Sequence, residues 1–169
     1  WHPSEPCVAV GWADGLVSFV DTGSRSDAGS GFARFDGRGA HGAAVSELRW
    51  SLDGARLLSA DEGGKVVVWR FDGGSRATVL QRLSCGEQGV SHAAWLAPVV
   101  GDSGRRSEFA CATSNGQVWV GDDSGSMQDV CSLGAPILAL AFSPTTSSTT
   151  TSTTSTPSLG RLLALSSAP

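Results

Sequence analysis

The sequence contains no tyrosine, one methionine and no long hydrophobic run. Its longest apolar stretches, AAWLAPVV and APILALAF, fall far short of the roughly 20 residues that a membrane-spanning helix needs, so no transmembrane segment is expected. The 12 lysines and arginines are scattered and the formal net charge is −4, so no basic stripe predicts nucleic-acid binding. The chain opens on Trp1 without a methionine or a signal peptide, and we expect it to be a piece of a longer protein.

Cysteines are few and far apart in the chain. There is no Cys-x-x-Cys pair and no histidine cluster at the spacing of metal ligands, which excludes the usual zinc sites. We expect free thiols in a reducing compartment, and we predict neither a metal nor another cofactor. The four cysteines are Cys7, Cys85, Cys111 and Cys131.

Glycine is abundant, with 22 among the 169 residues, and it separates short apolar runs. Many turns between short hydrophobic segments favour an all-β fold. Hydrophobic residues make up 40% of the chain, and its length is that of one domain.

One glycine motif raises the alternative of a nucleotide site. In GRGAHG, Gly37, Gly39 and Gly42 have the spacing of a dinucleotide-binding loop. Asp61 lies 22 residues after Gly39, where an acid would bind the ribose. However, the preceding GFARFD is a weak strand, and the following AAVSELRW runs at once into SLDG, which breaks a helix. We favour a loop that leads into a strand and keep the nucleotide site as the minor alternative.

An internal repeat accounts for most of the chain. Residues 1–21, WHPSEPCVAVGWADGLVSFVD, align without a gap to residues 50–70, WSLDGARLLSADEGGKVVVWR, at an offset of 49 residues. A third copy begins at Trp95, and Asn115-Gly116 takes the turn position there. A fourth begins at ILALAFSP, and its GRLLAL matches GARLLS of copy two.

Each copy predicts one small antiparallel sheet. Asp-Gly or Asn-Gly between two apolar runs is a strong hairpin signal, and residues 31–35 and 78–83 are candidates for a fourth strand. Such sheets bury both faces when they pack on their copies as blades of a β-propeller. We therefore predict an all-β partial propeller of about three and a half four-stranded blades. The copies lie near 1–40, 41–89, 90–134 and 135–169, and we expect a disordered Thr/Ser insertion at 145–158.

Copy two resembles a WD40 repeat. The resemblance is carried by His41, by WSLDG at 50–54 and by GKVVVW at 64–69. In that family a histidine, a strand serine or threonine, a turn aspartate and the tryptophan form a buried hydrogen-bonded network. The resemblance implies only part of this network here, because Gly63 stands where the turn aspartate is expected.

A narrower resemblance rests on WHPSEPCVAVGWADGLVSF and HGAAVSELRWSLDGARLLSADEGGKVVVWRFD. These segments are similar to the N-terminal propellers of WD-repeat subunits of intraflagellar transport complex A. The resemblance implies a non-enzymatic scaffold for protein–protein interaction, active in retrograde transport and cilium assembly. It also implies location in the cytoplasm, the cilium and the basal body. The alternatives are an unrelated WD-repeat scaffold and a propeller enzyme.

One rim of the predicted ring carries the candidate partner-binding residues. The repeat alignment places the turns of copies one and two at equivalent tips. Trp12, beside Asp14, is either packed or an exposed aromatic anchor. The adjacent acids Asp61 and Glu62 are interpreted as a solvated loop tip rather than an acid/base pair. We predict that these four residues bind a protein partner, whose basic groups the acids attract.

Catalytic motifs are weak. GDSG at 101–104 is similar to the nucleophile segment of trypsin-like proteases, but no histidine has the matching context, and a polar loop explains it better. Propeller enzymes converge charged or metal-binding residues in the central channel, whereas the turns here offer no repeated histidine or arginine. We therefore predict that the chain is not an enzyme.

Overall fold

The fold consists of thirteen β-strands in the described residues of a computed structural model, which are 1–25, 32–73, 76–96, 107–143 and 161–166. No helix in these ranges is long and apolar enough to cross a membrane. The Thr/Ser tract at 145–158 and the GDSG segment at 101–104 lie outside the described residues. The strands are β1 Cys7–Gly11, β2 Val17–Arg25, β3 Phe32–Gly37, β4 Val45–Trp50, β5 Arg56–Asp61, β6 Lys65–Gly73, β7 Arg76–Ser84, β8 Val90–Trp95, β9 Glu108–Thr113, β10 Gln117–Asp122, β11 Met127–Ser132, β12 Ile137–Ser143 and β13 Arg161–Ser166.

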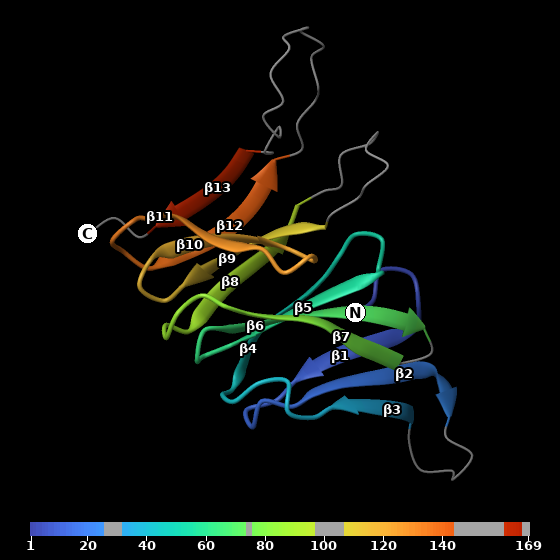
Figure 1. Ribbon diagram of the computed structural model, residues 1–169. Coiled ribbons are helices and arrows are strands. Elements are labelled where there is room, and N and C mark those ends of the chain that lie inside the picture. Colours follow the sequence, from blue (N-terminus) through green and yellow to red (C-terminus); the bar gives the residue numbers. More distant parts are fainter. Residues whose placement is uncertain (26–31, 74–75, 97–106, 144–160, 167–169) are drawn as a thin grey trace, which may run out of the picture.

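Four antiparallel sheets follow one another along the chain. Their strand orders are β1-β2-β3, β4-β5-β6-β7, β8-β9-β10-β11 and β12-β13. Figure 1 shows them packed side by side in sequence order, each one a blade of a propeller. Strands β4, β8 and β12 each begin a sheet, and β8 contacts both of the others. The predicted all-β partial propeller of about three and a half blades is therefore confirmed.

The sequence repeat appears as a repeated strand register. Ala9 pairs with Phe19 in the first sheet, Leu58 with Val68 in the second and Ala110 with Val120 in the third. The step from the first pair to the second is 49 residues and the next step is 52, as the alignment requires. Insertions therefore fall in connections, and the hairpins keep one register.

The core lies between neighbouring sheets. On β6, Val67 and Trp69 pack with Phe19 of the first sheet, whereas Val66 and Val68 pack toward the third sheet. Alternate side chains of a strand point to opposite faces, so a strand that is covered on both sides has an unbroken apolar run. This arrangement is why KVVVW contains no polar position between Val66 and Trp69.

In the turns of the β1–β2, β5–β6 and β9–β10 hairpins, a glycine allows close approach to the loop that enters the next sheet. At Gly64, φ is +83°, and a Cβ would collide with the backbone oxygen of Gly86 and lie 2.8 Å from that of Gln88. Gly15 and Gly116 are equivalent, with φ of +81° and +88° and the next loop at the same place. Only glycine combines this backbone conformation with this lack of space.

The glycines of GRGAHG do not form a nucleotide loop. Gly37 ends β3, and a Cβ there would lie 2.8 Å from Cζ3 of Trp69, so the residue makes room for a core side chain. The segment after Gly42 is strand β4 instead of the helix that a dinucleotide site requires. The minor alternative is therefore wrong.

Alanine at position 64 should destabilise the fold more than alanine at position 39. Both glycines have positive φ, so each change costs about 1–2 kcal/mol of backbone strain. A Cβ at Gly39 meets nothing within 4 Å, whereas at Gly64 it meets backbone. In urea denaturation, Gly64→Ala should lower the free energy of unfolding by about 2 kcal/mol more than Gly39→Ala does. Equal losses would contradict this role of Gly64.

Candidate functional site

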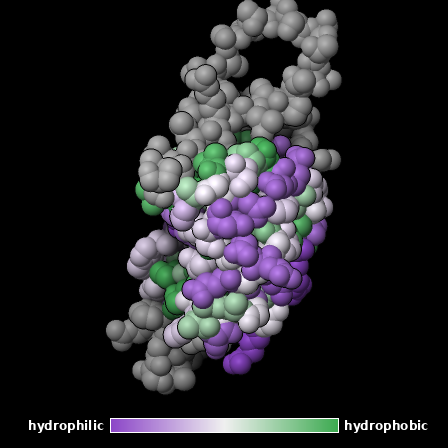
Figure 2. Space-filling view, turned by 90° about the vertical axis from the view of Figure 1, so that its left-hand side faces the viewer, coloured by the Kyte–Doolittle hydropathy of each residue, from purple (hydrophilic) through white to green (hydrophobic). Residues whose placement is uncertain are grey.

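The candidate site is the end of the sheets that holds the turns of the β1–β2, β5–β6 and β9–β10 hairpins. We call it the turn rim, and it comprises the turns at 12–16, 61–64 and 113–116 with the inter-sheet loops 38–44, 85–89 and 133–136. Backbone hydrogen bonds join the second and third turns to these loops, such as Ser114 N–H to Gly89 O at 2.8 Å and Leu133 N–H to Gly116 O at 2.9 Å, and they join the first turn to Val45 at the start of β4. Figure 2 looks toward this end, and hydrophilic side chains form a band along it.

Trp12 and Glu62 occupy neighbouring tips of the turn rim. The backbone oxygen of Trp12 accepts a hydrogen bond from Val45 N–H at 3.1 Å, and Glu62 N–H donates to Ala44 O at 2.9 Å. Because residues 44 and 45 are consecutive, the two tips are held beside the same point at the start of β4. The structure thus brings the predicted residues of copies one and two together.

Trp12 is half exposed, and its indole is anchored at one end. Its exposed fraction is 45%, and its Nε1–H donates to Ser18 Oγ at 3.0 Å. Ser18 lies on β2 and is fully buried, so the indole is fixed to the sheet while much of the ring reaches solvent. The structure therefore combines the two alternatives, packed and exposed, that the sequence left open for Trp12.

Asp14 and Glu62 are exposed acids on this surface. Asp14 Oδ1 accepts a hydrogen bond from Leu16 N–H at 3.1 Å, which fixes the shape of its turn. Glu62 follows Asp61 directly at the tip of the next turn. Both carboxylates are placed where they can attract a positively charged surface.

Asp61 is buried, so its interpretation as a solvated loop tip is wrong. Only 1% of the residue is exposed. Its Oδ1 accepts hydrogen bonds from Gly63 N–H at 3.0 Å and Lys65 N–H at 2.9 Å, and its Oδ2 accepts from His41 Nδ1–H at 3.1 Å. The carboxylate is turned inward to these donors and cannot contact a partner directly.

Asp61 also completes the network that was predicted to be partial. Trp69 Nε1–H donates to Ser59 Oγ at 2.8 Å, and the Ser59 hydroxyl donates to His41 Nε2 at 2.6 Å. With the bond from His41 to Asp61, the chain runs from the β6 tryptophan to the β5–β6 turn. The aspartate stands two residues before Gly63, the position that the family pattern indicated.

The repeat register contains a signal that sequence reasoning missed. The offset of 49 residues places Asp61 at the position of Trp12, and the offset of 52 places Thr113 there. Thr113 is fully buried, and its hydroxyl donates to Asn115 Oδ1 at 2.6 Å. At this position, the buried Asp61 and Thr113 make hydrogen bonds within the turns of the second and third sheets. In the first sheet the same position holds the half-exposed Trp12.

Among the titratable side chains of the turn rim, His41 and Asp61 are buried. In the described ranges, no three His, Cys, Asp or Glu side chains are grouped as a metal site requires. Burial lowers the pKa of His41 below its ordinary value, and the hydrogen bond and charge of Asp61 offset only part of this effect. His41 is therefore a neutral structural link inside the rim.

Comparisons with known proteins agree with this architecture. Residues 1–93 match the family model described as the IFT140 first β-propeller. The β-propeller domain of Myceliophteria thermophila Cps50 (Swd1) is 23% identical, with a TM-score of 0.57, over 89% of this chain and 39% of that chain. Saccharomyces cerevisiae Sqt1 is 21% identical, with a TM-score of 0.58, over 84% of this chain and 36% of that one.

A third similar structure is a chain of the mitotic checkpoint complex. It is 18% identical, with a TM-score of 0.61, over 82% of this chain and 39% of that chain. At such identities these likenesses show the fold alone. The chain spans between 36% and 39% of the length of the three structures.

Substitutions of the adjacent acids Asp61 and Glu62 should have very different effects on the free energy of unfolding. The Asp61 carboxylate now accepts hydrogen bonds from three N–H groups. Asp61→Asn replaces one of its oxygens by an NH2 group, which is itself a donor, so the variant should lose about 2 kcal/mol of the free energy of unfolding. Glu62→Gln, at the exposed tip, should change it by less than about 0.5 kcal/mol. Thermal denaturation of both variants measures this contrast, and equal effects would contradict the assigned role of Asp61.

Stability should also decrease with acidification because of His41. Since burial lowers its pKa, the unfolded chain takes up a proton near the ordinary value of 6.5 and the folded chain does so only at lower pH. The free energy of unfolding should therefore fall as the pH drops from about 6.5 toward the lowered pKa. His41→Gln should flatten this slope. An unchanged slope in His41→Gln would exclude His41 as the source.

Proposed function

The chain belongs to the family of the IFT140 first β-propeller, and on this premise we propose that it is part of a non-enzymatic WD-repeat scaffold in intraflagellar transport complex A. In this proposal the scaffold acts in retrograde transport and cilium assembly, in the cytoplasm, at the basal body and in the cilium. The family match over residues 1–93 supports the assignment to this transport system. The likeness to other propellers supports the scaffold fold.

We propose that the turn rim is the docking surface for another protein subunit. One observation carries this part: Trp12 is 45% exposed while Ser18 Oγ holds its indole N–H at 3.0 Å. An aromatic ring that is already oriented loses little side-chain entropy when a partner covers it. Tryptophan is also enriched among the residues that contribute most to interfaces.

The acids beside Trp12 define the chemistry of the partner. Asp14 and Glu62 are both exposed on the tips next to the ring. Acids at the edge of an interface accelerate association with a basic surface, whereas the covered aromatic ring supplies most of the affinity. The proposed partner surface is therefore an apolar patch bordered by lysine or arginine. Asp61 contributes from below, by holding the turn that carries Glu62.

Replacement of both exposed groups should release the partner. Trp12→Ala combined with Glu62→Lys should weaken binding by about 2 kcal/mol or more, which is roughly thirtyfold. The measurement is co-purification of complex A subunits with the protein, together with its enrichment in cilia. Circular dichroism should be unchanged, because neither side chain belongs to the buried core.

Trp1→Ala is the matched control. Trp1 is 79% exposed and precedes His2, whose ring contacts the opposite ends of the strands through Gly54 O at 3.0 Å. Co-purification should be normal in this variant. Undiminished co-purification of the Trp12→Ala, Glu62→Lys variant would exclude the turn rim as the docking surface.

A further inference from the structure

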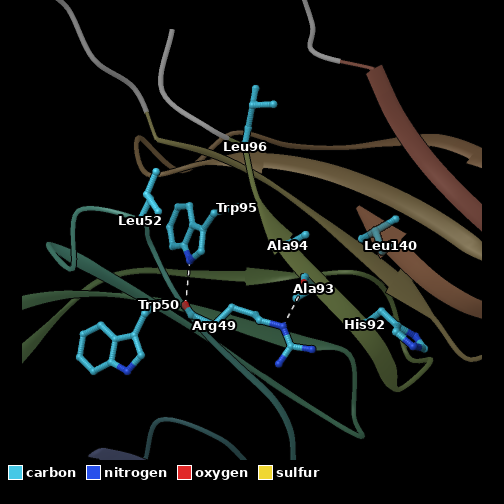
Figure 3. A pocket seen from close by; sticks show the side chains of 9 residues that line it. All are labelled: Arg49, Trp50, Leu52, His92, Ala93, Ala94, Trp95, Leu96 and Leu140. Carbon is cyan, nitrogen blue, oxygen red and sulfur yellow. Dashed lines mark hydrogen bonds between the residues drawn. The ribbon is translucent and has the colours of Figure 1, made fainter. Parts of the chain in front are cut away.

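A second surface lies near the ends of β4 and β8 that are remote from the turn rim, and these two strands and β12 are called the inner strands because each begins a sheet and β8 contacts the other two. A cavity opens between the second and third sheets and reaches the fourth sheet. Its volume of about 370 Å³ is within the range of ligand-binding pockets. Figure 3 shows its walls, which come from the ends of β4 and β8 and from β12. The lining residues are Arg49, Trp50, Leu52, His92, Ala93, Ala94, Trp95, Leu96 and Leu140.

The walls of this cavity, which we call the inner-strand pocket, are apolar with two basic exceptions. Apart from Arg49 and His92, every lining side chain in the described part of the chain is apolar or an indole, and none of these described lining residues is acidic. Leu52, in the turn after β4, is 77% exposed although it is a large apolar residue. A pocket of this composition is complementary to a ligand with an apolar group and a negative charge.

Arg49 is held in place with hydrogen-bonding capacity left over. Its Nε–H donates to Ala93 O at 3.1 Å, its Nη1 donates to Leu48 O at 3.1 Å, and its Nη2 contacts Glu47 Oε2 at 2.9 Å. A guanidinium has five N–H groups, so these three contacts leave two. The Arg49 side chain is 49% exposed, and the remaining N–H groups can reach a carboxylate.

Trp95 gives the pocket a fixed aromatic wall. Its indole N–H donates to Arg49 O at 2.7 Å, which joins β8 to β4 next to the guanidinium. Its ring also packs edge to face on Phe109, with centroids 5.4 Å apart. The apolar wall and the charged group are thus held together across one sheet interface. Glu47 offsets part of the charge of Arg49, so recognition depends on directed N–H groups more than on net charge.

We propose that the inner-strand pocket binds an acidic peptide segment of a partner protein. The segment inserts a leucine or phenylalanine side chain between Leu52 and Trp95 and places a neighbouring carboxylate against Arg49. This chemistry is opposite in charge to that proposed for the turn rim, which attracts a basic surface. The two surfaces therefore serve different partners, and either proposal stands if the other fails.

The test compares three blocked pentapeptides on the full chain by ligand-observed NMR titration. The probe is glycyl-aspartyl-leucyl-aspartyl-glycine, and its matched peptides replace both aspartates by asparagine or the leucine by serine. The probe should bind with a dissociation constant of about 1 mM or tighter, and at least about fivefold more tightly than either matched peptide. Equal binding of the probe and the asparagine peptide, or no binding up to about 5 mM, would overturn the proposal.

Substitutions in and outside the inner-strand pocket test whether the probe peptide binds there. Leu52→Asp should weaken the probe at least about tenfold, because it removes an apolar wall and repels the carboxylates. Leu52 is exposed, so this change leaves the fold intact. Leu138→Asp, the same change at an exposed leucine outside the pocket, should have no effect. Arg49→Met should bring the aspartate and asparagine peptides to equal affinity. Normal probe binding by Leu52→Asp would contradict the site.

Discussion

The bond from His41 to Asp61 links the two kinds of segment from which the turn rim is built. His41 lies in the loop that enters the second sheet, and Asp61 lies at the hairpin turn of that sheet. Behind them, Ser59 connects the histidine to Trp69, whose ring packs on Phe19 of the first sheet. A buried polar group without a partner is costly, so this chain of donors and acceptors fixes the loop, the turn and the sheet interface together.

The three equivalent turns use one position in different ways. In the second sheet the position holds the buried Asp61, and in the third the buried Thr113 donates within its own turn. In the first sheet it holds Trp12, whose indole N–H donates to Ser18 Oγ, while Asp14 Oδ1 accepts from Leu16 N–H within the same turn. The position is therefore buried in the second and third sheets and half exposed in the first.

Sequence reasoning predicted the fold because the repeat is ungapped within each hairpin. A constant offset of 49 residues between copies one and two preserves every cross-strand pair, so the register followed directly from the alignment. The role of Asp61 did not follow, because two adjacent acids on a turn look alike until the direction of each side chain is known. Only the three-dimensional turn shows that Asp61 meets His41 while Glu62 points outward.

The inner-strand pocket was equally invisible to the sequence. Arg49 and Trp95 are 46 residues apart, and an alternating strand pattern does not reveal that the indole of one bonds to the backbone of the other. By contrast, the apolar runs and hairpin turns that define each blade are short local segments, so each blade could be predicted from the sequence alone. Contacts between sheets depend on how blades pack, which a single sequence specifies only through the sum of many small contacts.

Hydrogen–deuterium exchange of the protein, free and assembled with complex A subunits, tests the account most directly. Assembly should slow exchange of the backbone amides in the turns at 12–16 and 61–64, since in the proposed complex a partner covers Trp12, Asp14 and Glu62. Exchange of the turn at 122–125, which is at the opposite end of the third sheet and outside the inner-strand pocket, should change less than that of the two rim turns. Unchanged exchange at both rim turns in the assembled complex would contradict docking through the turn rim.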